Sequence, residues 1–473
     1  MPRLNLIEFV VMLATIIQWL FLATLTGVIV GAGTSLFLHG LFAASGATEA
    51  VPLWLQMILL PAGGLLNGLL LFYGYRLNRT GLGDGVIAAV HNQSGRMPLR
   101  TMAIKPVAAI ITLASGGSAG KEGPCAHIGG SLASALGRLF GLNVELQKRL
   151  VACGVSAGFA SVFGTPIAGA IYGVEVLAIG QVRHDFLFPA IVAGVSSFEI
   201  SKFLGIPYQY YNIGLLPHFS ELVFIKTILI GVICGIVAAV FVEGISLARS
   251  LFNRLKSRFG LWPPLMPLAG GLLMSALILV IPTDYLGLSL PLMDRALAGE
   301  QMPYLGFFWK ALLVAITLGS GFYGGIVTPQ FVIGAITGNA FAHLLGISPM
   351  LGAAVGLVSV VASASNTPVA AIIMGVELFG GVAGTVYVAG AAIAAYVIVG
   401  HRSVYPDQLV AYTKSSWIHH GLGLSLGQSR LHLSYGLLKW VRRLQFRLGY
   451  RSRYEKRTGR TRRRDVIDTR EGS

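Results

Sequence analysis

Charged residues are unusually scarce in this chain. Asp, Glu, Lys and Arg make up only 11% of its 473 residues and hydrophobic residues make up 54%, whereas soluble domains carry roughly 25% charged residues. A water-soluble protein of this length could not cover its surface with so few charges. Apolar stretches such as 10–37, 53–72, 222–242 and 383–399 come close to or exceed the roughly 20 residues that cross a bilayer. We therefore predict an all-α polytopic membrane protein that is solvated largely by lipid.

Shorter apolar stretches, such as 151–160 and 332–345, alternate with the long ones and are bounded by turns that contain Gly or Pro. Stretches of this length do not span a bilayer on their own. Their alternation with long spans indicates tilted and discontinuous helices that meet near the middle of the membrane.

The net charge of +16 is concentrated at the C-terminal end. From Arg430 onwards the chain has 14 Lys and Arg residues against 4 Asp and Glu residues. Basic segments that flank membrane spans tend to stay in the cytoplasm, so residues 414–473 are predicted to form a basic cytoplasmic tail. Within it, 435–450 has the pattern of a basic amphipathic helix on anionic lipid. A tail joined to a membrane domain favours lipid, and not nucleic acid, as its partner.

The chain also contains an internal repeat. Residues 112–116 (Thr-Leu-Ala-Ser-Gly) recur as 317–321 (Thr-Leu-Gly-Ser-Gly), at an offset of 205 that also relates Pro124 to Pro329. A second block recurs at an offset of 202, which relates 165–168 and 173–175 to 367–370 and 375–377. Two blocks in the same order at nearly equal offsets predict a duplicated membrane unit, with halves at 1–215 and 216–413.

Each half contains a Gly-rich turn, at 116–124 and 321–329, that ends in Pro and leads into an apolar helix. Gly lets the backbone approach a ligand, and Pro belongs to the first turn of a helix. The N–H groups there lack helical partners and carry partial positive charge. Two such turns predict a site for a small anion, although similar turns also join packed helices. A phosphate-binding P-loop is excluded because Glu122 follows Lys121 where Ser or Thr is required.

Glu122 is the most informative single residue, because a carboxylate deep in an apolar region is costly unless it is neutralised or functional. Its oxygen atoms can take the place of the anion against the same N–H donors. Protonation would weaken that hold, so Glu122 is predicted to act as a gate. The alternative is a Glu that caps the start of its own helix.

At these residues the chain resembles the CLC family of chloride channels and chloride/proton antiporters. Residues 120–124 match the family motif Gly-[Lys/Arg]-Glu-Gly-Pro, and 325–329 match Gly-x-Phe-x-Pro with Val327 in place of Phe. Tyr405 falls where the family has its filter tyrosine. The resemblance covers about 10–413.

The resemblance implies a CLC-type fold of two inverted repeats and a homodimer with one pore per subunit. It also implies that the protein lies in a bacterial inner membrane with both termini on the cytoplasmic side. Glu122 would be the gating residue, and no cofactor is implied other than the transported chloride or related anion. The anion-binding residues that it implies are Lys121, Gly123, Ile326, Val327 and Tyr405.

Two positions depart from the family pattern. The first filter motif, Gly-Ser-Gly-Ile-Pro, is matched only loosely by 83–86, which puts Asp84 at the anion-contacting position. An N-cap role for Asp84 is the alternative. Val176 occupies the position of the glutamate that carries protons in exchangers of the family. Glu175 and Glu377, which recur in both halves, are predicted to accept hydrogen bonds inside the bundle.

These features predict passive chloride transport through a pore gated by Glu122. A chloride/proton antiporter of the same fold is the first alternative. A membrane-embedded enzyme or receptor is the alternative from another class, although the chain lacks a recognisable set of catalytic carboxylates, metal ligands or nucleophile and base.

Overall fold

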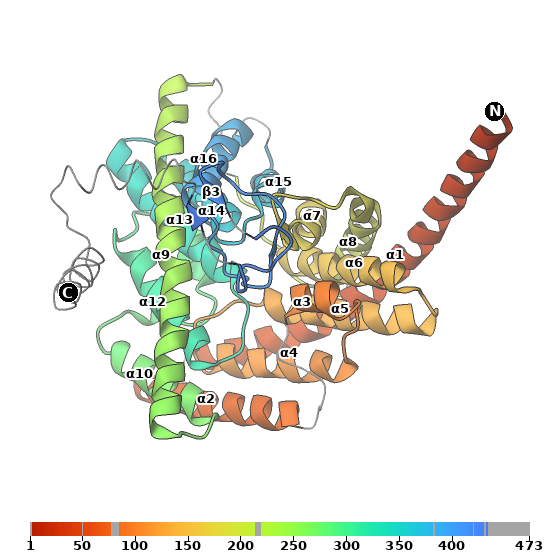
Figure 1. Ribbon diagram of the computed structural model, residues 1–473. Coiled ribbons are helices and arrows are strands. Elements are labelled where there is room, and N and C mark those ends of the chain that lie inside the picture. The colour runs from red at the N-terminus through yellow and green to blue at the C-terminus, as the bar shows by residue number, and fades with distance from the viewer. Residues whose placement is uncertain are drawn as a thin grey trace, which may run out of the picture.

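The computed structural model describes residues 2–49, 51–76, 85–212, 219–381, 384–419, 421–429 and 432–433. Asp84 and the predicted helix at 435–450 lie outside these described residues. Within them the chain forms α-helices almost throughout, with four strands of two residues each, so the prediction of an all-α protein is confirmed (Figure 1).

The helices before residue 216 are α1 (Pro2–Glu49), α2 (Leu53–Arg76), α3 (Val86–Asn92), α4 (Leu99–Ala114), α5 (Glu122–Leu139), α6 (Val144–Phe163), α7 (Pro166–Glu175) and α8 (His184–Phe203). Those after it are α9 (Glu221–Phe259), α10 (Leu265–Leu277), the 3-10 turn η1 (Thr283–Tyr285), α11 (Leu290–Leu297), α12 (Gly306–Ser320), α13 (Val327–Leu345), α14 (Pro349–Ala364), α15 (Pro368–Phe379) and α16 (Thr385–Ile398). The strands are β1 (Ala178–Ile179) and β2 (Leu409–Val410), which pair in parallel, and β3 (Ile418–His419) and β4 (His432–Leu433), which pair antiparallel.

Four helices of the described chain are long and apolar enough to cross a membrane, namely α1, α2, α8 and α9. Along α1 the large apolar side chains Phe9, Ile17 and Phe21 are about 60% exposed, at 65%, 58% and 61%. Because water would disfavour such a surface, this face of α1 is suited to lipid.

The predicted short apolar stretches are parts of longer helices. The stretch 151–160 lies within α6, which has 20 residues, and 332–345 lies within α13, which has 19 residues. Both helices are buried along most of their length. Polar residues extend these two helices beyond the apolar runs, and the Ser, Thr and Gln side chains among them are buried as well.

Small residues bring the central helices into backbone contact. A Cβ atom on Gly129 of α5 would collide with the carbonyl oxygen of Gly154 of α6, and one on Gly334 of α13 would collide with that of Gly356 of α14. Because no other side chain permits this approach, glycine is required at these crossings. Gly129 and Gly334 are related by the repeat offset of 205, so corresponding glycines pack α5 on α6 and α13 on α14.

The repeated glutamates link the two halves reciprocally. The Glu175 carboxylate accepts hydrogen bonds from the N–H groups of Val369 (3.1 Å) and Ala370 (2.7 Å), in the first turn of α15. The Glu377 carboxylate accepts hydrogen bonds from Ile167 (3.0 Å) and Ala168 (2.7 Å), in the first turn of α7. Each carboxylate thus caps the other half's helix, where the helix dipole also favours negative charge. The predicted hydrogen-bonding role of Glu175 and Glu377 is confirmed.

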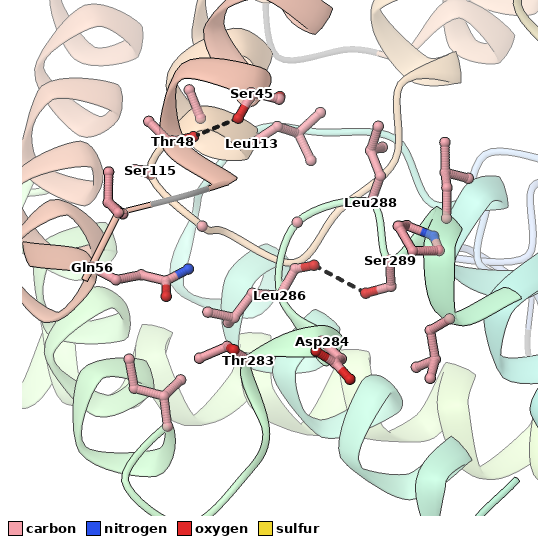
Figure 2. Close-up of a pocket in the computed structure, with 18 of the residues that line it drawn as sticks. Ser45, Thr48, Gln56, Leu113, Ser115, Thr283, Asp284, Leu286, Leu288 and Ser289 are labelled. Atoms are coloured by element: carbon pink, nitrogen blue, oxygen red, sulfur yellow. Dashed lines mark hydrogen bonds between the residues drawn. The ribbon is translucent and has the colours of Figure 1, made fainter. Parts of the chain in front are cut away.

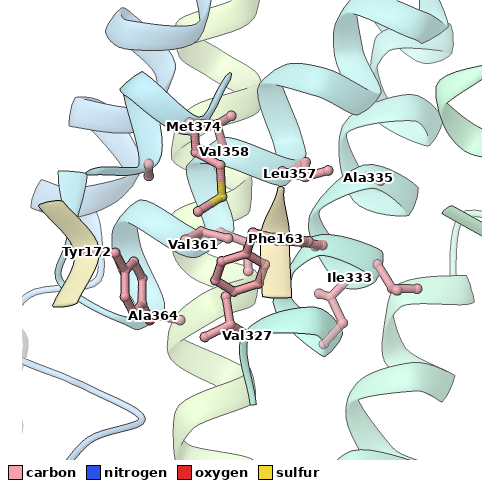
Figure 3. Packing of buried hydrophobic residues seen from close by; sticks show 14 of the residues in the cluster. Phe163, Tyr172, Val327, Ile333, Ala335, Leu357, Val358, Val361, Ala364 and Met374 are labelled. Carbon is pink, nitrogen blue, oxygen red and sulfur yellow. The ribbon is translucent and has the colours of Figure 1, made fainter. Parts of the chain in front are cut away.

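Aromatic side chains fill the core beside the start of α13. The ring centroid of Phe163 lies 5.2 Å from that of Phe331 and 6.4 Å from that of Tyr172. Figure 3 shows Phe163 next to Val327, with Val361 of α14 nearby. This packing holds the first turn of α13 rigidly against α6, α7 and α14.

Candidate anion site

The two Gly-rich turns meet in the interior. The N–H group of Gly120 donates to the carbonyl oxygen of Gly325 (2.8 Å), and the N–H group of Gly325 donates to that of Gly120 (2.7 Å). These two glycines correspond to one another at the offset of 205. Their reciprocal pair brings the starts of α5 and α13 together, as expected if both contribute to one site.

Glu122 begins α5 and is 1% exposed, but its carboxylate belongs to the start of the other helix. Its Oε1 accepts a hydrogen bond from the N–H group of Val327, the first residue of α13. Its Oε2 accepts one from the Thr328 hydroxyl at 2.7 Å. No described Lys or Arg lies within salt-bridge distance of it. Neutral donors at a helix start therefore hold the negative charge, as they would hold a bound anion.

Glycine is required on both sides of this carboxylate. A Cβ atom on Gly120 or Gly325 would overlap the carboxylate oxygen atoms of Glu122. Gly123 also lies close to the opposite turn, since its Cβ atom would be 3.1 Å from the Gly325 Cα atom. The motif glycines thus let the two turns close around a negatively charged group.

Tyr405, in the segment after α16, lies at one end of a chain of hydrogen-bonded side chains. Its hydroxyl is 3.3 Å from that of Tyr172, which donates to the Ser365 hydroxyl at 2.9 Å. The Ser365 hydroxyl donates to Oε1 of Gln330, on α13, at 2.9 Å. Gln408 holds the Tyr405 segment in place, because its Nε2 donates to the carbonyl oxygens of Val176 (2.9 Å) and Ser365 (2.8 Å).

The other predicted residues lie around this centre. Ile326 precedes α13 as its N-cap. The Lys121 ammonium lies over the Phe42 ring, 5.1 Å from its centroid, in a cation–π contact. Val176 is 2% exposed at the end of α7 and places no titratable group there. Asp84 falls outside the described residues, so its role stays a prediction.

Sequence reasoning missed several polar residues of this region. Thr328 occupies a variable position of the second motif, and Gln330 lies just beyond that motif, so neither residue type was marked by the pattern. A signal for two buried lysines did exist, since Lys105 and Lys310 are related by the offset of 205. Lys310 donates to the Gly287 carbonyl oxygen and the Ser289 hydroxyl, both at 2.8 Å.

A separate cavity of about 850 Å³ opens beside the ends of α1 and α4 and the segment before α11. Figure 2 shows Ser45, Gln56 and Asp284 among its lining residues. Glu122, Val327 and Tyr405 do not line it, so it is distinct from the candidate anion site. No group of His, Cys, Asp and Glu in the described part of the chain could hold a metal ion.

A helical membrane bundle in which two duplicated helix starts enclose a buried carboxylate defines a protein of the anion channel and transporter class. The family model described as voltage gated chloride channel matches residues 75–400. The chain therefore belongs to the CLC family and is an integral, multi-pass membrane protein. The predicted resemblance and fold class are confirmed, and the family consists of channels and transporters.

Several relatives are similar over most of the chain. A chloride/fluoride channel protein of Pseudomonas syringae pv. tomato is 35% identical over 421 residues, which cover 86% of this chain and 89% of the relative. A voltage-gated ClC-type chloride channel of Salmonella dublin is 25% identical, over 77% of this chain and 85% of the relative.

Solved structures agree. The crystal structure of a CLC-type fluoride/proton antiporter superposes with a TM-score of 0.76 and 31% identity, covering 83% of this chain and 97% of that one. That of a slow cyanobacterial Cl−/H+ antiporter gives a TM-score of 0.67 at 20% identity, covering 80% of this chain and 94% of that one, and supports the fold alone.

Proposed function

We propose that the chain conducts small halides, chloride and fluoride, passively across the membrane through a site gated by Glu122. The observation that carries this proposal is the Glu122 carboxylate bound by the Val327 N–H group and the Thr328 hydroxyl. A side chain that occupies an anion's donors competes with the anion, and it can leave when its charge is removed by protonation. The relative at 35% identity, described as a chloride/fluoride channel protein, supports both halides.

Within this proposal the main-chain N–H groups of Ile326 and Val327 bind the passing anion, together with the Tyr405 hydroxyl, whose single proton turns from its 3.3 Å contact with Tyr172 to the anion. Lys121 supplies positive charge next to the gate, and Gly123 keeps the turns close together. The buried, apolar Val176 supports uncoupled transport, because coupled exchange needs a titratable relay to Glu122.

Halide/proton antiport is the second candidate. The structure at 31% identity and a TM-score of 0.76 is described as a fluoride/proton antiporter, and Glu122 is itself a titratable group at the site. In an antiporter the proton would reach Glu122 by a route that does not use position 176.

Flux from proteoliposomes distinguishes the two candidates. Vesicles loaded with potassium fluoride or chloride are diluted into an impermeant anion, and halide and pH electrodes record both ions. We expect halide efflux that requires valinomycin, because uncoupled anion movement builds up a voltage, and no accompanying proton movement. Proton movement against its gradient, driven by halide, would replace the channel with the antiporter. No flux of either halide would overturn both.

We also propose that the protein is a homodimer in a bacterial inner membrane, with both termini on the cytoplasmic side. α16, α15, α7 and α8 follow one another across the upper part of Figure 1. Their outward side chains are apolar and exposed, including Phe188 (45%) of α8 and Ile393 (46%) and Val397 (55%) of α16. The matching positions of α8 and α16 in the two halves make this face suitable for a two-fold contact.

Light scattering of the detergent-solubilised protein tests the dimer. We expect the mass of two chains, and we expect Ile393→Trp to give one, because the larger side chain keeps the two faces apart. Val10→Trp on α1, where Val10 is 55% exposed, is the matched control and should leave two chains. If the Ile393→Trp variant still has the mass of two chains, the contact between the subunits lies elsewhere.

A further inference from the structure

A buried amide donor lies next to the candidate anion site without a partner. Gln330, on α13, is 0% exposed. Its Oε1 accepts the hydrogen bond from the Ser365 hydroxyl at 2.9 Å. Its Nε2 has no hydrogen-bond partner within the described structure. Because burying an N–H donor without a partner costs free energy, such a group needs an explanation, and next to an anion site a bound anion is one that its chemistry fits.

The position of Gln330 on α13 directs its side chain towards the site. It follows Val327 by three residues, so the two share a face of the helix. Helical side chains lean towards the N-terminus of their helix. At that end the Val327 N–H group and the Thr328 hydroxyl bind Glu122. Through Ser365 and Tyr172, Gln330 is also linked to the Tyr405 hydroxyl.

The hydroxyl chain determines which end of the amide is free. Tyr172 donates to Ser365, so the Ser365 proton is available for Gln330 Oε1. That bond leaves the NH₂ group, and not the oxygen, as the unpaired end. A structural amide on the same helix behaves differently, because Asn339 donates to the Ala296 carbonyl oxygen (2.9 Å) and accepts from the Met302 N–H group (3.1 Å).

We propose that Gln330 is a selectivity-determining residue whose Nε2–H group donates a hydrogen bond to the halide between the Glu122 position and Tyr405. This inference rests on the proposed function. Fluoride is smaller than chloride and concentrates its charge, so it gains more from a fixed N–H donor. Gln330 therefore favours fluoride over chloride, and a site built around this donor penalises its removal.

Gln330→Met tests the inference, because Met has a similar volume and no donor. Fluoride and chloride efflux are measured over a range of internal concentrations in proteoliposomes. We expect the half-saturating fluoride concentration to rise about tenfold, which corresponds to one hydrogen bond, and the chloride value to change less. Gln330→Met also removes the acceptor of the buried Ser365 hydroxyl, so its thermal unfolding midpoint should fall and serves only to show that the variant folds. A purely structural glutamine would lower the midpoint in the same way but would leave the fluoride to chloride ratio unchanged.

Two further variants act as controls. Ser359→Ala removes another buried hydroxyl that has no partner in the described structure, on α14, and should leave the ratio unchanged. Ser365→Ala removes the hydrogen bond that orients the Gln330 amide, so it should lower the preference for fluoride over chloride. This variant replaces Gln330→Met as the test if Gln330→Met does not fold. If the Gln330→Met variant folds and its fluoride to chloride ratio equals that of the wild type, the inference about Gln330 is wrong. If Gln330→Met does not fold, an unchanged ratio in Ser365→Ala has the same meaning. Neither result affects the proposed function. Absence of halide flux in the wild type overturns the proposed function.

Discussion

Replacement of Glu122 by Gln is expected to make halide flux independent of external pH. In the wild type, protonation removes the charge that the Val327 N–H group and the Thr328 hydroxyl stabilise, so acid should increase flux. Gln carries no charge at any pH, and Glu122→Ala removes altogether the side chain that competes with the halide. The measurement is halide efflux from proteoliposomes at a series of external pH values from acid to neutral. A pH dependence that persists in both variants would exclude Glu122 as the gate.

Thr328→Val gives a graded version of the same experiment. It removes one donor from the carboxylate while keeping the shape of the side chain, and a hydrogen bond to a charged group contributes about 1.5–3 kcal/mol. We therefore expect flux at neutral pH to rise about tenfold or more. Thr337→Val on the same helix is the matched control, because that buried hydroxyl donates only to the Ile333 carbonyl oxygen (2.7 Å). Equal flux in the Thr328 variant and wild type would contradict the proposed hold on Glu122.

The second large effect is the loss of stability that we expect when one of the two reciprocal caps, Glu175 or Glu377, is removed. Glu175→Ala removes the acceptor of the partly buried Val369 N–H group and of the buried Ala370 N–H group, at a cost of up to about 3–6 kcal/mol for two hydrogen bonds to a charged group. Glu377→Ala should cost less, about 1–2 kcal/mol, because Glu377 is only half-buried and water can replace it. Thermal unfolding in detergent should rank the midpoints as wild type, then Glu377→Ala, then Glu175→Ala.

Glu175→Gln separates lost hydrogen bonds from lost volume. It keeps the size of the side chain and one acceptor oxygen, so its unfolding midpoint should lie between those of the wild type and Glu175→Ala. Equal midpoints for Glu175→Ala and Glu377→Ala would show that burial does not set the cost of these caps.

The sequence was sufficient for the protein class. The scarcity of charge requires a lipid-solvated surface whatever the helix arrangement, because hydration of a soluble protein of this size needs more polar surface. The burial of Glu122 was also predictable, since this residue follows directly on a Gly-rich turn in an apolar region, whereas its role as a gate stays a prediction. The hydrogen-bonding role of Glu175 and Glu377 followed from their recurrence at corresponding positions.

The partners of these residues were less predictable. That Glu122 is bound by Thr328, and Glu175 by the first turn of α15, depends on how residues about two hundred positions apart meet. Local periodicity carries no information on such pairs, because it reports only neighbours on the same helix. Gln330 is the clearest example, since nothing around it in the sequence distinguishes it from an ordinary polar residue in a helix.

The sequence by itself determined that the chain dissolves in lipid, is duplicated and presents two glycine turns, the first of which contains the acidic residue Glu122. Only the tertiary structure decided that these turns bond to each other and that Glu122 lies against the opposite helix. The physical reason is that main-chain donors gain their effect from convergence in a low-dielectric interior, and convergence is a property of the packed fold.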